Sequence, residues 1–175
     1  MRGFLLTMAT ITSTFYRDGN RVPIWTDGII TKRTVTFAGA TADAWGNDGG
    51  ALDGGALFTV TGLVRVSMVG VCTTLLAGGA TLETGITGAT AIFNAQTTDT
   101  AIDAGEIWFN NATPATYFIL GESTAAADNL PEYVLNGNDI ILTVSGGADT
   151  TSGIIDFYAI WVPWSTDGNI VATTT

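Results

Sequence analysis

The sequence predicts an all-β fold, and within that class a jelly-roll-like antiparallel β-sandwich. The chain has 175 residues and contains 22 glycines with many threonines, valines and isoleucines, a composition that favours strands joined by tight turns. Short runs alternate between apolar and polar residues, and turn signals recur roughly every eight to twelve residues. No stretch longer than a turn or two has helical periodicity. An immunoglobulin-like sandwich is the alternative.

The N-terminal part is expected to form an arm or hairpin over residues 1–29, ahead of a sandwich domain over residues 30–175. Two strand-like runs flank Asp18-Gly19, which is a favoured two-residue hairpin turn. The first sandwich strand is expected within 31–39, where apolar and threonine side chains alternate. The glycine-rich stretch 39–56 is expected to be a long loop.

The remaining strands follow from alternation and from turn residues. Asn136-Gly137 separates two alternating runs, which predicts a hairpin between them. The other strands are expected within 56–62, 63–74, 81–87, 89–96, 105–110, 115–121, 131–147 and 153–164.

The final strand, 153–164, is apolar on both faces and interrupted by Asp156 alone. A strand in an isolated sandwich should have one polar, solvent-facing side. We therefore expect Tyr158, Ile160 and Val162 to lie at a homo-oligomer interface. The alternative is that residues 9–30 of the same chain cover them.

The net charge of −10 argues against binding to nucleic acid or to an anionic membrane surface. It also keeps copies of the chain apart until specific contacts form. The basic residues are confined to the N-terminal part of the chain, and none follows Arg65. They are Arg2, Arg17, Arg21, Lys32, Arg33 and Arg65.

The residue inventory argues against an enzyme and implies no cofactor. The chain has no histidine, which excludes the common nucleophile–histidine pairs and an ordinary zinc site. Its one cysteine, Cys72, is expected to be a buried small hydrophobe, and no disulfide can form within the chain. The single lysine leaves no phosphate-binding loop motif.

Three weaker possibilities remain open from the residues. A carboxylate pair for glycoside hydrolysis could come from Asp99, Asp103 and Glu106, although a turn whose acidic residues face solvent is the preferred explanation. A cation could bind near Asn47, Asp48 and Asp53, but their spacing does not match a calcium loop, and no metal is predicted. A sugar could stack on Trp45 or Trp108 if their rings are exposed.

Four phrases of the sequence together resemble a family of small virion structural proteins of tailed bacteriophages. The likeness extends from about Met8 to Ala172 and includes no catalytic motif. The phrases are "TKRTVTFAGATADAWG", "LFTVTGLVRVSMVGVCTT", "DAGEIWFNNATPAT" and "NGNDIILTVSGGADTTSGIIDFYAIWVPWSTDGNIVA".

The resemblance implies a capsid decoration or cement protein, located on the outside of the virion after synthesis in the host cytoplasm. It implies partners that are copies of the chain itself, typically in a homotrimer, and the major capsid protein. A glycan- or receptor-binding module of a head fibre or tail is the alternative. The arm is suited to docking on an acidic neighbour because interfaces favour arginine and aromatic residues. The residues expected to make this contact are Tyr16, Arg17, Arg21, Trp25, Lys32 and Arg33.

Overall fold

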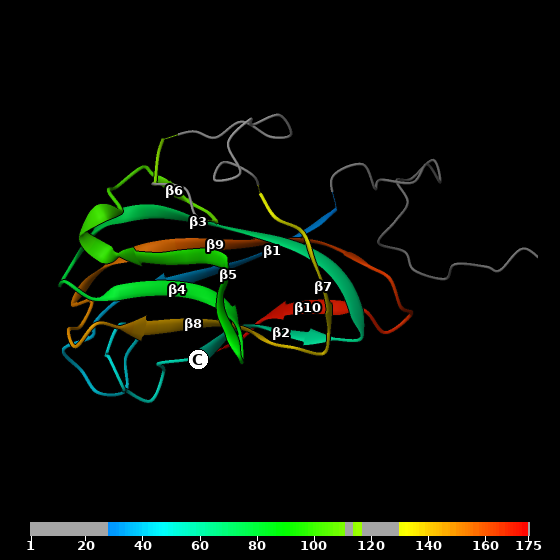
Figure 1. Cartoon of the computed structure of the whole chain (residues 1–175), viewed down its shortest axis with the longest axis horizontal. Coiled ribbons are helices and arrows are strands. Elements are labelled where there is room, and N and C mark those ends of the chain that lie inside the picture. The colour runs from blue at the N-terminus through cyan, green and yellow to red at the C-terminus, as the bar shows by residue number, and fades with distance from the viewer. Residues whose placement is uncertain (1–27, 111–113, 117–129, 175) are drawn as a thin grey trace, which may run out of the picture.

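Two antiparallel sheets pack face to face in the computed structural model, which describes residues 28–110, 114–116 and 130–174 (Figure 1). One short 3-10 turn, Asp99–Ala101, follows the fifth strand. The strands are β1 (Ile29–Thr36), β2 (Gly55–Thr61), β3 (Leu63–Ala77), β4 (Thr81–Ile86), β5 (Ala89–Thr98), β6 (Ile107–Trp108), β7 (Tyr133–Asn136), β8 (Ile140–Ser145), β9 (Ser152–Pro163) and β10 (Asn169–Ala172).

The strand order confirms the predicted all-β, jelly-roll-like sandwich. The first sheet has the order β1-β9-β3-β6, and β7 pairs with another part of β3. The second sheet has the order β10-β2-β8-β4-β5. Strands from late in the chain are inserted between earlier ones, with β9 between β1 and β3 and β8 between β2 and β4 (Figure 1). This interleaving across two sheets is the topology of a jelly roll.

The predicted elements agree with the structure over most of the described residues. The sandwich begins at Ile29, and the glycine-rich stretch forms turns and bends between β1 and β2. The arm or hairpin expected over residues 1–29 lies outside the described residues, apart from Gly28 and Ile29. Most of the strand expected at 115–121 lies outside them as well.

The hairpin predicted around Asn136-Gly137 is wrong. β7 pairs with β3 in the first sheet, whereas β8 pairs with β2 and β4 in the second sheet. The turn therefore carries the chain from one layer to the other. Gly137 has a φ of 71°, and its amide donates to the Gly62 carbonyl, while the Asp139 carboxylate accepts the Val60 amide. These bonds anchor the crossover to the β2–β3 corner rather than to a partner strand.

The core lies between the two sheets and is built from the inward faces of the alternating strands. In β3, Val64, Val66, Met68 and Cys72 are buried, as their shared face predicted. Trp108 is completely buried and packs edge-on against Phe157 of β9. Burial of large aromatic and aliphatic side chains of this kind is the main stabilising contribution in such a fold.

Side-chain hydrogen bonds tie the sheets together along both long edges of the sandwich. On one side, the Thr31 hydroxyl of β1 donates to the Ile170 carbonyl of β10. On the other side, the Asn94 amide of β5 donates to the Trp108 carbonyl of β6. The Ala95 amide also donates to the Asn110 carbonyl, which continues this link. Unpaired backbone groups on an edge strand can pair with a strand of another chain, and these links cover part of both edges.

Candidate interaction surface

The outer face of the β1-β9-β3 sheet is the candidate functional surface. Burial alternates along β9, where Ile155, Phe157 and Ala159 point into the core and are buried. Ile154, Asp156, Tyr158, Ile160 and Val162 occupy the opposite face and are partly exposed. Four of these five outward residues are apolar or aromatic, so this sheet lacks the polar outer face that a solvated sheet usually has.

Neighbouring strands extend the apolar surface on both sides of β9. Ile30 of β1 pairs with Ile160 and is 61% exposed. On the other flank, Val134 of β7 pairs with Arg65 of β3 and is 48% exposed. Ile30 and Ile160 lie side by side, which is typical of a contact surface, whereas Arg65 separates Val134 from Val162.

One part of this face is already covered by the chain itself. Val69 and Phe109 are buried in a small cluster outside the main core, and Leu130 and Tyr158 pack against it. Ile160 and Val162 are not members of that cluster. With respect to the described residues, the uncovered part of the surface lies around Ile30, Ile160, Val162 and Val134, which we call the apolar patch. Residues 1–27 join the chain just before β1, which begins beside this patch.

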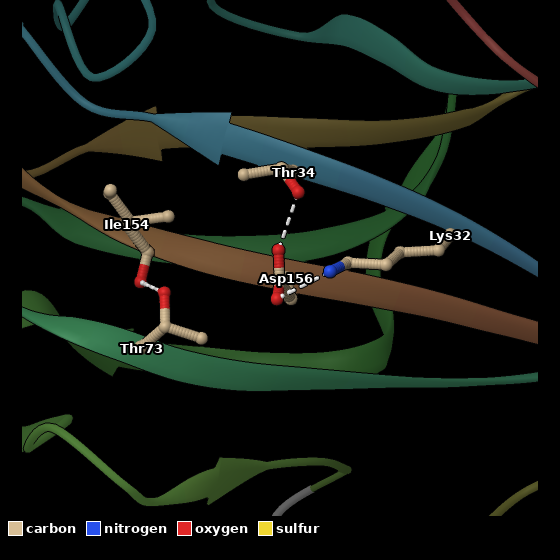
Figure 2. Close-up of polar contacts among 5 residues, drawn as sticks. All are labelled: Lys32, Thr34, Thr73, Ile154 and Asp156. Atoms are coloured by element: carbon tan, nitrogen blue, oxygen red, sulfur yellow. Dashed lines mark hydrogen bonds and ion pairs between the residues drawn. The ribbon is translucent and has the colours of Figure 1, made fainter.

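A polar group lies within this face, centred on Asp156 (Figure 2). Lys32 Nζ lies 2.7 Å from one carboxylate oxygen of Asp156, and the Thr34 hydroxyl donates to the other oxygen at 2.5 Å. The Lys32 Nζ atom is also 5.6 Å from the centre of the Tyr158 ring. Both donors come from β1, the strand paired directly with β9. Each carboxylate oxygen thus has a partner.

These contacts shift the pKa values of the two charged partners. Burial opposes ionisation of Asp156, but hydrogen bonds from Lys32 and Thr34 and the Lys32 charge outweigh it, so its pKa is lowered. The hydrogen bond to Asp156 raises the pKa of Lys32. Both groups are therefore charged at neutral pH.

The charges on this face balance, although the molecule is strongly acidic. Outward-facing Lys32 is paired with Asp156, and outward-facing Arg65 lies 3.6 Å from Glu132. The described residues include twelve acidic side chains and three basic ones, of which Arg33 is buried. The two exposed cations of the described residues therefore both lie here, and the excess negative charge lies elsewhere.

The second sheet has a different outer surface. The partly exposed residues of its central strands include the polar Thr143 and Ser145 of β8 and Glu83 of β4. Gln96 of β5 is exposed. Its large exposed apolar side chain is Val171, on edge strand β10. This surface has the polar character expected of a solvated sheet.

The structure places two of the six residues expected to contact a partner. Lys32 lies on the outer face of β1, whereas Arg33 points into the sandwich and is only 5% exposed. Both belong to the sandwich rather than to an arm. Tyr16, Arg17, Arg21 and Trp25 lie outside the described residues.

Arg33 has an internal role that its sequence context did not indicate. Its Nη1 atom donates to the carbonyl and hydroxyl of Thr173, just beyond β10. Its guanidinium lies 5.2 Å from the centre of the Trp45 ring, in the loop after β1. Desolvation by burial lowers its pKa. Arg33 thus connects the first strand, the glycine-rich loop and the C-terminal segment.

The acidic residues considered for a cation have structural partners. The Asp53 carboxylate accepts the amides of Gly49 and Val144, and the Asp48 carboxylate accepts the amide of Gly147. The Asn47 amide donates to the Gly39 carbonyl. Within the described part of the chain, no group of three or more acidic or cysteine side chains could hold a metal ion.

Two of the carboxylates considered for glycoside hydrolysis hydrogen-bond to the backbone and side chains around them. Asp99 is fully buried, and one of its oxygens accepts the amides of Gly79 and Ala80 and the Thr150 hydroxyl. The Glu106 carboxylate accepts the backbone amide of Asp103 in a turn. These contacts account for the two residues as parts of the fold.

The remaining side chains singled out from the sequence are interior. Trp45 and Trp108 are 6% and 0% exposed, so neither ring is presented for stacking on a sugar. Cys72 is buried, as predicted, and burial raises the pKa of its thiol. Such a thiol is poorly suited to nucleophilic chemistry.

The fold and this surface define the chain as an antiparallel jelly-roll sandwich with one apolar, charge-balanced outer face. No helix among the described residues is long and apolar enough to cross a membrane. Comparisons with protein-family models, with curated proteins and with solved structures give no match.

Proposed function

We propose that this chain is a non-enzymatic structural protein of a tailed-bacteriophage virion, which decorates or cements the outside of the capsid as a homo-oligomer. The observation that carries the self-association is the apolar, charge-balanced face of the β1-β9-β3 sheet. The assignment to a virion rests on the resemblance of the four sequence phrases. Measurement of binding to capsids tests this assignment.

Self-association through the apolar patch follows from the balance of forces on an acidic protein. Identical copies with a charge of −10 repel one another over most of their surface. The patch around Ile160 and Val162 is where apolar area can be buried without bringing unpaired like charges together. The resemblance implies a trimer, and the mass of the assembly in solution measures the copy number.

Sedimentation of glutamate variants tests this contact. Ile160→Glu should dissociate the oligomer because it places an unpaired carboxylate within the patch. Tyr158→Glu should act in the same direction. Gln96→Glu adds the same charge to the opposite sheet and is the matched control, which should leave the mass unchanged. An unchanged mass for both Ile160→Glu and Tyr158→Glu would contradict the proposed interface.

Capsid docking is assigned to the N-terminal residues, with their arginines and aromatics facing an acidic neighbour. An oligomer that offers several such segments gains avidity of about two to four orders of magnitude over one segment. Deletion of residues 1–27, which ends before β1, should abolish co-sedimentation with capsids while the sandwich remains folded. The full-length chain should saturate capsids at on the order of hundreds of copies and increase their resistance to heat. Full binding by the truncated chain would overturn the docking role.

A glycan-binding module of a head fibre or tail is the second candidate, and one observation favours it. Trp164, directly after β9, is 57% exposed, unlike Trp45 and Trp108. An exposed indole can stack on a sugar ring. Quenching of tryptophan fluorescence by soluble glycans, lost in Trp164→Ala, would support this function. Saturation of the capsid at only a handful of copies would point the same way.

A further inference from the structure

We infer that the Lys32–Asp156 pair, with Thr34, aligns two copies of this chain within their shared interface. The inference rests on the proposed self-association and adds to it a residue-level determinant of how the copies fit. An apolar patch alone attracts another apolar surface in many orientations, because the hydrophobic effect has no direction. A polar group beside the patch on the same face restricts the orientations that are compatible with burial.

The position of the pair supports this role. Asp156 interrupts the apolar outer face of β9, next to Tyr158 and two residues from Ile154 on the same side. Its cross-strand neighbours are Thr34 on β1 and Val71 on β3. A copy that covers Ile160 and Ile30 therefore also lies close to the pair, because Ile30 and Lys32 are successive outward residues of β1.

The hydrogen bonding of Asp156 makes its burial tolerable. Its side chain is only 13% exposed, and both oxygens already accept hydrogen bonds from the same chain. Removing a carboxylate from water costs much less when the carboxylate is already paired and hydrogen-bonded. Asp156 can therefore be covered by another copy without a new partner.

Lys32 is the member that imposes a requirement on the covering copy. Its side chain is 47% exposed, and an ammonium group has three donor positions, of which Asp156 and Tyr158 of the same chain take two. Covering Lys32 with a purely apolar surface leaves the remaining donor unpaired. A second copy can supply acceptors from the same face, namely the Asp156 carboxylate and the Tyr158 hydroxyl. Arrangements that bring one of these acceptors to Lys32 satisfy its remaining donor, and other arrangements do not.

The variant Lys32→Met gives opposite results under the two interpretations. If the pair aligns the copies, the variant leaves Asp156 covered without its countercharge, and the dissociation constant should rise by about 30-fold or more. If the pair stays in water outside the contact, methionine adds apolar surface and association should be unchanged or tighter. That second result would overturn the inference. Lys32→Arg, which keeps the ion pair, should retain most of the affinity.

Asp156→Asn tests the other member of the pair with a nearly isosteric change. It should weaken association, while Glu83→Gln on the opposite sheet removes a carboxylate as the matched control and should have no effect. The double variant Lys32→Met/Asp156→Leu removes the pair completely and should restore association, because a buried ion pair can be replaced by apolar residues at little cost.

Alignment itself is measured with a spin label at Thr36→Cys, an exposed position on β1, since the native Cys72 is buried. The otherwise unmodified chain should give one narrow label-to-label distance distribution, and the double variant a broad one. Equal widths would contradict an aligning role. A chain that is monomeric at every concentration would instead contradict the proposed self-association and this inference with it, so sedimentation separates the two failures.

Discussion

The Asn94 side-chain amide donates a hydrogen bond to the Trp108 carbonyl at 2.5 Å, and so joins β5 of one sheet to β6 of the other. The same side chain accepts a hydrogen bond from the Thr84 hydroxyl, also at 2.5 Å. Asn94 and Thr84 are both fully buried. One asparagine therefore satisfies two interior polar groups and closes one edge of the sandwich.

Replacement of Asn94 by alanine should destabilise the fold strongly. It leaves the Thr84 hydroxyl and the Trp108 carbonyl buried without their partner, at an expected cost of about 2–4 kcal/mol in the free energy of unfolding. Denaturant unfolding measures this cost. Gln96→Ala, two residues away on the same strand but exposed, should change stability by no more than about 0.5 kcal/mol. Equal losses of unfolding free energy in the two variants would show that the hydrogen bonds of Asn94 do not stabilise the fold.

Arg33 should behave as a structural residue in spite of its charge. Arg33→Met removes hydrogen bonds to Thr173 and the contact with Trp45, and it should cost about 2–3 kcal/mol of unfolding free energy. The comparison is Arg65→Met, whose loose pair with Glu132 is exposed and should contribute at most about 1 kcal/mol. A normal melting temperature for Arg33→Met would show that its interior contacts are dispensable.

Gly46 should tolerate no side chain. Its φ is 98°, and a Cβ atom there would lie 2.3 Å from the Thr150 carbonyl oxygen, which belongs to the backbone. Gly46→Ala should therefore disrupt the packing of the glycine-rich loop against the β8–β9 connection. Gly49 also has a positive φ, of 73°, but a Cβ atom there meets nothing within 4 Å. Gly49→Ala should show backbone strain alone, about 1 kcal/mol, and the difference in melting temperature isolates the clash.

The titration of Asp156 should depend on Lys32. Because its folded pKa is lowered, Asp156 contributes stability above its unfolded pKa of about 3.9 and loses that contribution as the pH falls through the folded value. The affected window therefore lies below about pH 4. NMR of the side-chain carboxyl should show the pKa rising in Lys32→Met. Arg65→Met, which lacks contact with Asp156, should leave the titration unchanged.

Local sequence patterns were sufficient to predict the sandwich and most of its strands, because alternation records which side of each strand is buried. They missed β10, whose four residues are too few to show a clear alternation. The doubly apolar character of β9 also led directly to the candidate surface. The apparent hairpin at Asn136-Gly137 failed because a turn signal reports a reversal of the chain, not which strands then pair. Arg33 was misplaced for a related reason, since Lys32 and Arg33 are adjacent in sequence but point to opposite faces of β1.

The polar partners of the interior were beyond reach from sequence. Asn94, Thr84 and Asp99 lie within ordinary-looking strand and turn sequences, and their partners come from other strands or loops. The pairing of Lys32 with Asp156 joins residues more than a hundred positions apart. Such contacts depend on sheet order, which no local pattern specifies.

The insertion of β8 and β9 between earlier strands has a consequence for how the protein is made. β1 and β3 are neighbours only through β9, and β2 and β4 only through β8. During synthesis, β4 can pair with β5 soon after both emerge from the ribosome, but β1 and β2 emerge with their apolar sides open and no sheet partner available. The link between β2 and β4 must wait until the chain has been made as far as Ser145, and the link between β1 and β3 until Pro163, the end of β9. Such delayed, long-range pairing makes folding slow and leaves the nascent chain dependent on protection from aggregation.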